Sequence, residues 1–71
     1  MKIILTNHVR KRMQERGVLE KEIMECVHYP DKIFRESERI YRCQKVFPYG
    51  ILRVVGEIKG DYFVVITAYP L

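Results

Sequence analysis

The sequence is poor in cysteine, glycine and proline, and it has no long apolar run. Its two cysteines, Cys26 and Cys43, lie in apolar patterns without a Cys-x-x-Cys pair, which favours reduced, buried thiols over a disulfide or a zinc site. Four glycines, three prolines and no low-complexity segment argue against a disordered chain. We expect neither a metal ion nor another cofactor.

Membrane insertion and export are also not expected. No apolar run approaches the roughly 18 residues that a membrane span needs. The opening MKIILTNH is too short for a signal peptide. We therefore expect a cytoplasmic protein with no membrane partner.

The composition is that of one small folded domain spanning residues 1–71. Apolar residues make up 48% of the chain and charged residues 31%. A chain of this length buries only about 60% of the surface that it exposes when unfolded, so its core is small.

The positive charge is concentrated at the start of the chain. Residues 1–17 carry the whole formal net charge of +4, because basic and acidic residues balance over residues 18–71. The basic residues of the opening segment are Lys2, Arg10, Lys11, Arg12 and Arg16. Such a patch attracts phosphate groups. The alternative is a solvated helix that is simply rich in arginine.

Two helices are predicted in the first half of the chain. Thr6 or Asn7 can cap a helix over residues 7–16, and Gly17 is suited to end it in a left-handed conformation. A second helix should begin at Leu19 or Glu20 and run to residue 28, where the Tyr-Pro pair stops it.

One stripe of the first helix is polar and borders its apolar stripe. The apolar positions are Val9 and Met13, and the polar stripe runs through His8, Arg12 and Arg16. Both arginines could instead pair with acidic residues, the candidates being Glu15, Glu20 and Glu57.

After Pro30 the pattern changes to extended segments rich in β-branched and aromatic residues, at 32–36, 39–47, 51–58 and 62–69. The breaks between them are short enough for hairpins only. We therefore predict an α+β fold with both helices on one face of an antiparallel four-stranded meander. Residues 2–5 either add a fifth strand or lead into the first helix.

Alternation predicts which strand residues face the helices. In residues 51–58 the predicted core positions are Leu52, Val54 and Ile58, which turns Arg53, Val55 and Glu57 outward. In residues 62–69 the predicted core positions are Val64, Ile66 and Ala68, with Phe63, Val65, Thr67 and Tyr69 on the other face. For residues 39–47 two core assignments stay open: Tyr41, Cys43 and Phe47, or Ile40 and Val46.

The segment HVRKRMQERGV (8–18), an acidic helix ending at Pro30 and the segment VVITAY (64–69) resemble a family of small bacterial domains of unknown function. Its members open with His-Ala-x-x-Arg-Met-x-x-Arg-Gly-Ile and close with a Val-Thr-Val-Tyr-like strand. The matching residues are His8, Arg12, Met13, Arg16, Gly17, Pro30, Thr67 and Tyr69. The family is usually grouped with the RelE/ParE toxin-like (barnase/colicin/RelE-type) superfamily of metal-independent ribonucleases and gyrase-directed toxins.

The chain departs from the family pattern at two positions. Val9 replaces the usual alanine, which changes packing. Leu19 replaces the usual Ser or Thr before the second helix, and losing that cap costs about 1 kcal/mol of helix stability. The resemblance implies a RelE/ParE-like fold, cleavage of RNA and an antitoxin-like protein partner.

Cleavage of RNA without metal needs a base, an acid and a cation that holds the developing negative charge. An imidazole such as that of His8 exchanges protons near neutral pH, and guanidinium groups match phosphate oxygens in pairs. We predict a catalytic set of His8, Arg12 and Thr67. We predict a nucleic-acid-binding set of Lys11, Arg16, Arg53 and Tyr69.

Two other classes of function stay open. The same residues could hold RNA, DNA or an acidic protein without catalysis. A chain this small could also act as an interaction domain that forms a homodimer or completes its core against a partner. Binding that weakens steeply with salt would favour nucleic acid over a protein partner.

Overall fold

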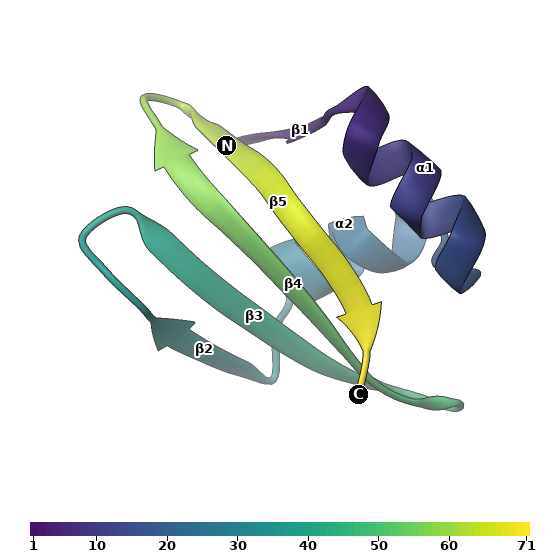
Figure 1. The fold of residues 1–71 in the computed structure, drawn as a ribbon. Coiled ribbons are helices and arrows are strands. Elements are labelled where there is room, and N and C mark those ends of the chain that lie inside the picture. The colour runs from purple at the N-terminus through teal and green to yellow at the C-terminus, as the bar shows by residue number, and fades with distance from the viewer.

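Two helices precede a run of hairpin-connected strands, and both helices cover one face of the sheet (Figure 1). The structure is a computed structural model that describes all 71 residues. Its elements are β1 (Lys2–Leu5), α1 (Asn7–Arg16), α2 (Glu20–His28), β2 (Lys32–Arg35), β3 (Ile40–Phe47), β4 (Gly50–Lys59) and β5 (Tyr62–Pro70). The predicted α+β class is confirmed. Neither helix has the length and apolar character needed to cross a membrane.

The sheet has five strands in the order β1-β5-β4-β3-β2 and is mixed. The strands β2 to β5 form the predicted antiparallel meander, whereas β1 pairs with β5 in parallel. The prediction of a four-stranded, purely antiparallel sheet was therefore wrong, and residues 2–5 do form a fifth strand. Parallel neighbours need a long connection, which here is the whole chain from α1 to β4, so no short-range pattern could reveal this pair.

Local capping sets the ends of the helices as the sequence predicted. The Thr6 Oγ1 accepts a hydrogen bond of 3.2 Å from the Val9 N–H at the start of α1. Gly17 ends α1 with a φ of 67°. At the start of α2 the Glu22 carboxylate accepts a hydrogen bond of 2.9 Å from the Leu19 N–H. This bond satisfies one backbone donor at a helix start that lacks a Ser or Thr cap.

The core lies between the helices and the sheet. Its buried members are Val9, Met13, Val18, Ile23, Cys26, Cys43, Leu52, Val54, Phe63, Val65 and Ala68. In β3 the first of the two core assignments is the correct one, because Cys43 is buried while Tyr41 and Phe47 pack against the core. In β4 the predicted alternation is confirmed.

A β-bulge overturns half of the prediction for β5. Along β4 and β5 the pairing runs from Lys59–Tyr62 to Gly56–Val65, and it resumes at Val55–Thr67, so Ile66 has no partner. The extra residue reverses the alternation. As a result Phe63 and Val65 are buried in place of the predicted Val64 and Ile66.

The prediction for the residues of β5 that follow the bulge is confirmed. Ala68 is buried, and Thr67 and Tyr69 lie on the sheet face that the helices do not cover. We call this face the open face. A strand without the bulge that buries Phe63 and Val65 would also have buried positions 67 and 69.

Gly56 is needed for the packing of Phe63 beside the bulge. A Cβ atom at position 56 would lie 2.3 Å from the Phe63 Cε2 and 2.4 Å from its Cζ. These separations are far inside van der Waals contact, and the Phe63 ring is 3% exposed, so it has little room to move.

We predict that Gly56→Ala lowers the free energy of unfolding by about 1–3 kcal/mol, because overpacking displaces a buried ring. Urea unfolding followed by circular dichroism measures the change. The same substitution in a Phe63→Leu background should cost less, because leucine lacks the Cε2 and Cζ atoms that lie closest to the added Cβ. An equal cost in both backgrounds would contradict this explanation.

Candidate functional site

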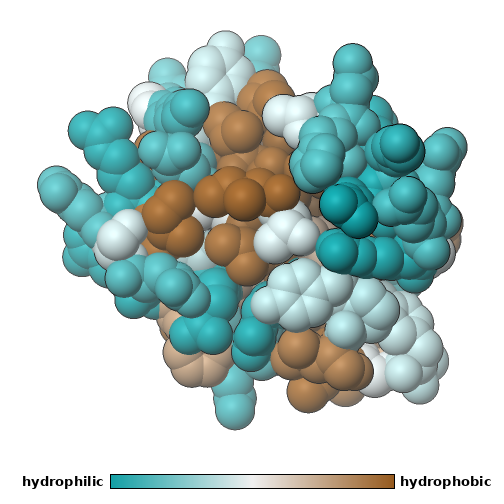
Figure 2. Space-filling model, in the orientation of Figure 1, coloured by the Kyte–Doolittle hydropathy of each residue, from teal (hydrophilic) through white to brown (hydrophobic).

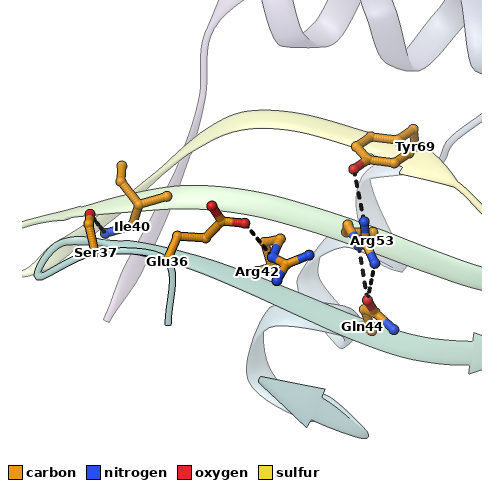
Figure 3. A network of polar contacts seen from close by, with 7 residues as sticks. All are labelled: Glu36, Ser37, Ile40, Arg42, Gln44, Arg53 and Tyr69. Atoms are coloured by element: carbon orange, nitrogen blue, oxygen red, sulfur yellow. Dashed lines mark hydrogen bonds and ion pairs between the residues drawn. The ribbon is translucent and has the colours of Figure 1, made fainter. Parts of the chain in front are cut away.

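A row of polar side chains crosses the open face on three adjacent strands. Gln44 of β3 pairs with Arg53 of β4, which pairs with Tyr69 of β5. The Arg53 Nε and Nη2 donate hydrogen bonds of 2.9 and 2.6 Å to the Gln44 Oε1, and its Nη1 donates one of 3.3 Å to the Tyr69 hydroxyl (Figure 3). The guanidinium group is thus held in one orientation on the sheet.

Arg16, the last residue of α1, reaches the same site from the side. Beyond Val65 the edge of β5 is not paired with β1, which ends at Leu5. The Arg16 Nη1 donates hydrogen bonds to the Thr67 hydroxyl (3.2 Å) and to the Ala68 carbonyl (3.1 Å) on this stretch of β5. It therefore covers a free sheet edge and also sits beside the polar row.

Arg16 and Arg53 share one aromatic neighbour. Each guanidinium carbon lies 5.9 Å from the centroid of the Tyr69 ring, which is within the range of a cation–π interaction. The polar row and the two residues that extend it are Gln44, Arg53, Tyr69, Thr67 and Arg16, and we call this set the arginine site.

Neither arginine of this site has a carboxylate partner. The four ion pairs of the chain are Arg10–Glu20, Arg12–Glu15, Arg42–Glu36 and Lys59–Glu57. Arg42, on the same face, is paired with Glu36 and stacks on the Phe34 ring at 4.9 Å. The arginine site thus keeps two uncompensated positive charges and favours an anion.

The other predicted site residues lie in a separate group. His8, Lys11, Arg12 and Glu15 line a concavity of about 130 Å³ on α1. Arg12 pairs with Glu15 at 3.5 Å, as the alternative interpretation allowed. His8 precedes Arg16 by eight residues, which is about 12 Å along a helix. The structure thus brings Arg16, Arg53, Thr67 and Tyr69 together, and His8, Lys11 and Arg12 form a second group.

Apolar side chains adjoin the arginine site on the open face. Figure 2, in the orientation of Figure 1, shows them as a brown patch surrounded by hydrophilic residues. Register and exposure assign to this face Ile4, Val55, Val64 and Ile66. Ile66 is 46% exposed because it is the unpaired residue of the bulge.

Gln44, whose amide orients Arg53, was not predicted as a site residue. Its position could have been found from the hairpin between β3 and β4. Phe47 and Gly50 close a two-residue turn, and counting back from that pair places Gln44 opposite Arg53. The Arg53–Tyr69 pair could not be counted in the same way, since the bulge shifts the register by one residue.

The cysteines are unsuited to nucleophilic chemistry. Cys26 and Cys43 are both free and buried. Burial raises the pKa of the Cys26 thiol from its ordinary value of 9.0 to about 12, and burial also raises the pKa of Cys43. A thiol reacts as its thiolate, so both side chains stay inert near neutral pH. No group of three or more potential metal-binding side chains is close enough to hold an ion.

Comparison with known proteins connects the chain to one family. Residues 5–70 match the family described as "Domain of unknown function (DUF4258)". No curated protein and no solved structure gives a significant match.

The raised thiol pKa predicts that stability falls at alkaline pH. Below the ordinary pKa both folded and unfolded chains carry the neutral thiol. As the pH rises above about 9, Cys26 ionises only in the unfolded chain and favours unfolding. The melting temperature should therefore drop between pH 8 and pH 10.5, and the drop should be smaller in Cys26→Ala. An equal drop in both proteins would contradict the assignment to this thiol.

Proposed function

The chain belongs to the DUF4258 family, and we propose that this member binds single-stranded RNA on the open face of its sheet. In this proposal Arg16 and Arg53 hold phosphate groups, and Tyr69 and Thr67 position the strand. The observation that carries the proposal is that two oriented guanidinium groups without carboxylate partners share one tyrosine ring.

The hydrogen bonds of the two arginines support binding of phosphate. Arg53 and Arg16 donate to neutral oxygens only, on Gln44, Tyr69, Thr67 and Ala68. A phosphate oxygen accepts charge-assisted hydrogen bonds that are roughly twice as strong as those to a neutral acceptor. An arriving phosphate therefore gains contacts that the folded chain itself does not supply.

The apolar patch on the open face favours unpaired nucleotides over duplexes. Sequence-specific RNA-binding proteins mostly bind single strands, whose unstacked bases lie against aromatic and apolar side chains of a sheet. The exposed side chains of Ile4 and Ile66 lie on the same face as the arginine site, with Ile66 directly before Thr67, and provide such a surface. A regular duplex buries its bases and would leave this patch in water.

The grouping of this family with RelE/ParE toxins, which the sequence resemblance implies, agrees with the same proposal. It implies a cytoplasmic, toxin-like domain that acts on RNA, with an antitoxin-like protein as partner. An antitoxin-like partner and a homodimer remain proposals alongside RNA. RNA is the preferred partner because the unpaired positive charges lie on the same face as the apolar patch.

Metal-independent cleavage of RNA is the second candidate function. It is favoured by the concavity in which His8 lies beside Lys11 and Arg12. There an imidazole can take or give a proton while Lys11 holds a phosphate, which Arg12 can contact only by leaving Glu15. Because His8 and Arg16 are about two helical turns apart, the concavity and the arginine site would contact different phosphates of one strand.

We predict that Arg53→Ala weakens binding of a fluorescein-labelled single-stranded RNA octamer about ten- to a hundredfold, the usual value of a hydrogen-bonded charge. Fluorescence anisotropy over a series of salt concentrations measures it. The slope of log K against log salt should decrease by about 0.7 for each phosphate that the variant no longer neutralises.

Two variants control for this measurement. Arg10→Ala removes an equal charge from α1, but Arg10 is paired with Glu20 at 3.0 Å, so its loss should change affinity little. Arg53→Lys keeps the charge and loses the planar fork, and it should fall between wild type and Arg53→Ala. If Arg10→Ala weakens binding as much as Arg53→Ala, the arginine site is not the binding site.

For the second candidate, we predict that His8→Ala abolishes cleavage of RNA while leaving binding within about twofold. Single-turnover incubation of a mixed RNA pool with excess protein, with chelator present, measures cleavage. Arg12→Ala should slow the reaction without abolishing it, because Lys11 lines the same concavity. A wild-type protein that binds RNA and never cuts it would remove cleavage and leave binding as the function.

A further inference from the structure

A hollow lies at the end of the polar row that is opposite Arg16. It has a volume of about 130 Å³ and is lined by Asp31, Lys32, Gln44, Lys45, Val46 and Ile51. Lys32 pairs with Gln44 across β2 and β3, just as Gln44 pairs with Arg53 across β3 and β4. The hollow is therefore continuous with the arginine site.

Gln44 presents a hydrogen-bond donor at this hollow. Its Oε1 already accepts two hydrogen bonds from Arg53, of 2.9 and 2.6 Å. This fixes the amide so that its nitrogen points away from the guanidinium group (Figure 3). The amide oxygen is occupied, so Gln44 can offer a ligand only its two N–H groups.

Asp31 presents a hydrogen-bond acceptor at the same hollow. Its Oδ2 accepts a hydrogen bond of 2.7 Å from the Val46 N–H, which holds the carboxylate beside β3. The Asp31 N–H donates to the Gln44 carbonyl at 2.8 Å, so the residue is anchored at both ends. The Oδ1 takes part in no ion pair and no hydrogen bond of the chain, and it remains available to a ligand.

The remaining walls combine a cation with apolar surface. Lys32 is exposed and unpaired, whereas the Lys45 ammonium group donates to the Tyr29 carbonyl at 2.9 Å. Val46 and Ile51 pair across β3 and β4 and give the hollow an apolar side. An apolar wall with a few convergent polar groups is the usual composition of a small-ligand site.

These groups match guanine better than adenine. The hollow offers donors from Gln44 and Lys32 and an anionic acceptor from Asp31. Guanine carries two neighbouring acceptors, O6 and N7, and two neighbouring donors, N1–H and the N2 amino group. Adenine is usually bound by both atoms of a glutamine amide, and here the Gln44 oxygen is already used.

We propose that the hollow at Asp31, Lys32 and Gln44 binds an unpaired guanine base of the strand held at the arginine site. The Asp31 carboxylate accepts from the guanine N1–H and N2 amino group, and the Gln44 amide and Lys32 donate to its acceptor atoms. The inference rests on the proposed function, and it deepens it by naming the preferred base.

The test compares RNA octamers that carry one guanine, inosine or adenine in a uridine strand. Wild type should bind the guanine strand about tenfold more tightly than the adenine strand, the usual value of a good base contact. Inosine lacks the N2 amino group and should fall between them. Asp31→Asn keeps the shape of the side chain and should reduce the guanine preference to within twofold.

Asp61→Asn is the matched control, since Asp61 is exposed in the turn between β4 and β5 and is far along the strands from the hollow. It removes the same charge and should keep the guanine preference. If the guanine preference of Asp31→Asn equals that of Asp61→Asn, or if wild type shows no guanine preference, the inference is wrong.

Failure of the guanine site can be distinguished from failure of the proposed RNA binding. Loss of affinity for all three strands in Arg53→Ala tests phosphate binding, whereas the ratio between strands in Asp31→Asn tests base recognition. Binding that depends on Arg53 without any base preference would overturn the guanine site alone. A preference for adenine over guanine would overturn it as well.

Discussion

The single extra residue in β5 determines what the open face of the sheet presents. Without the unpaired Ile66, the alternation that buries Phe63 and Val65 would also bury positions 67 and 69. The bulge turns Thr67 and Tyr69 to the other face and brings Tyr69 opposite Arg53. Bulges are frequent beside functional sites because they re-aim side chains in this way. In this sheet the bulge also exposes Ile66, directly before Thr67, which accepts a hydrogen bond from Arg16.

The distribution of carboxylates distinguishes the arginines of the chain from one another. Arg10, Arg12 and Arg42 each have an acidic partner, so their charge is largely balanced. Arg16, Arg35, Arg39 and Arg53 have no carboxylate partner, and among them only Arg16 and Arg53 share one aromatic ring. The net charge of +4 says little about this difference, because it is a sum over the whole chain. The local pairing of charges decides where an anion is favoured.

Short-range patterns were sufficient to predict the helices and most of the meander. Capping by Thr6, the left-handed Gly17 and the stop before Pro30 depend on neighbours within a few residues, and the structure has them as predicted. The facing of β4 followed from alternation alone. These features are visible in the sequence because the interactions that cause them are local.

Long-range features could not be predicted in the same way. The parallel pairing of β1 with β5 joins segments separated by nearly the whole chain, and no local signal marks the bulge at Ile66. The prediction that His8, Arg12 and Arg16 lie one turn apart on a helix was correct. It did not predict one site, since only Arg16, at the end of α1, reaches β5. Four of the seven predicted site residues meet in the arginine site. The fifth member, Gln44, orients Arg53 and could be found only from the register of β3 and β4.

The hydrogen bond from Arg16 to β5 also affects how the protein behaves in solution. The part of β5 beyond Val65 has no neighbouring strand on one side, and uncovered edges of this kind recruit strands from other molecules. The Arg16 side chain occupies this edge through the Ala68 carbonyl. An anion that drew the guanidinium group away would uncover the edge, so solubility and ligand occupancy are linked through a single side chain.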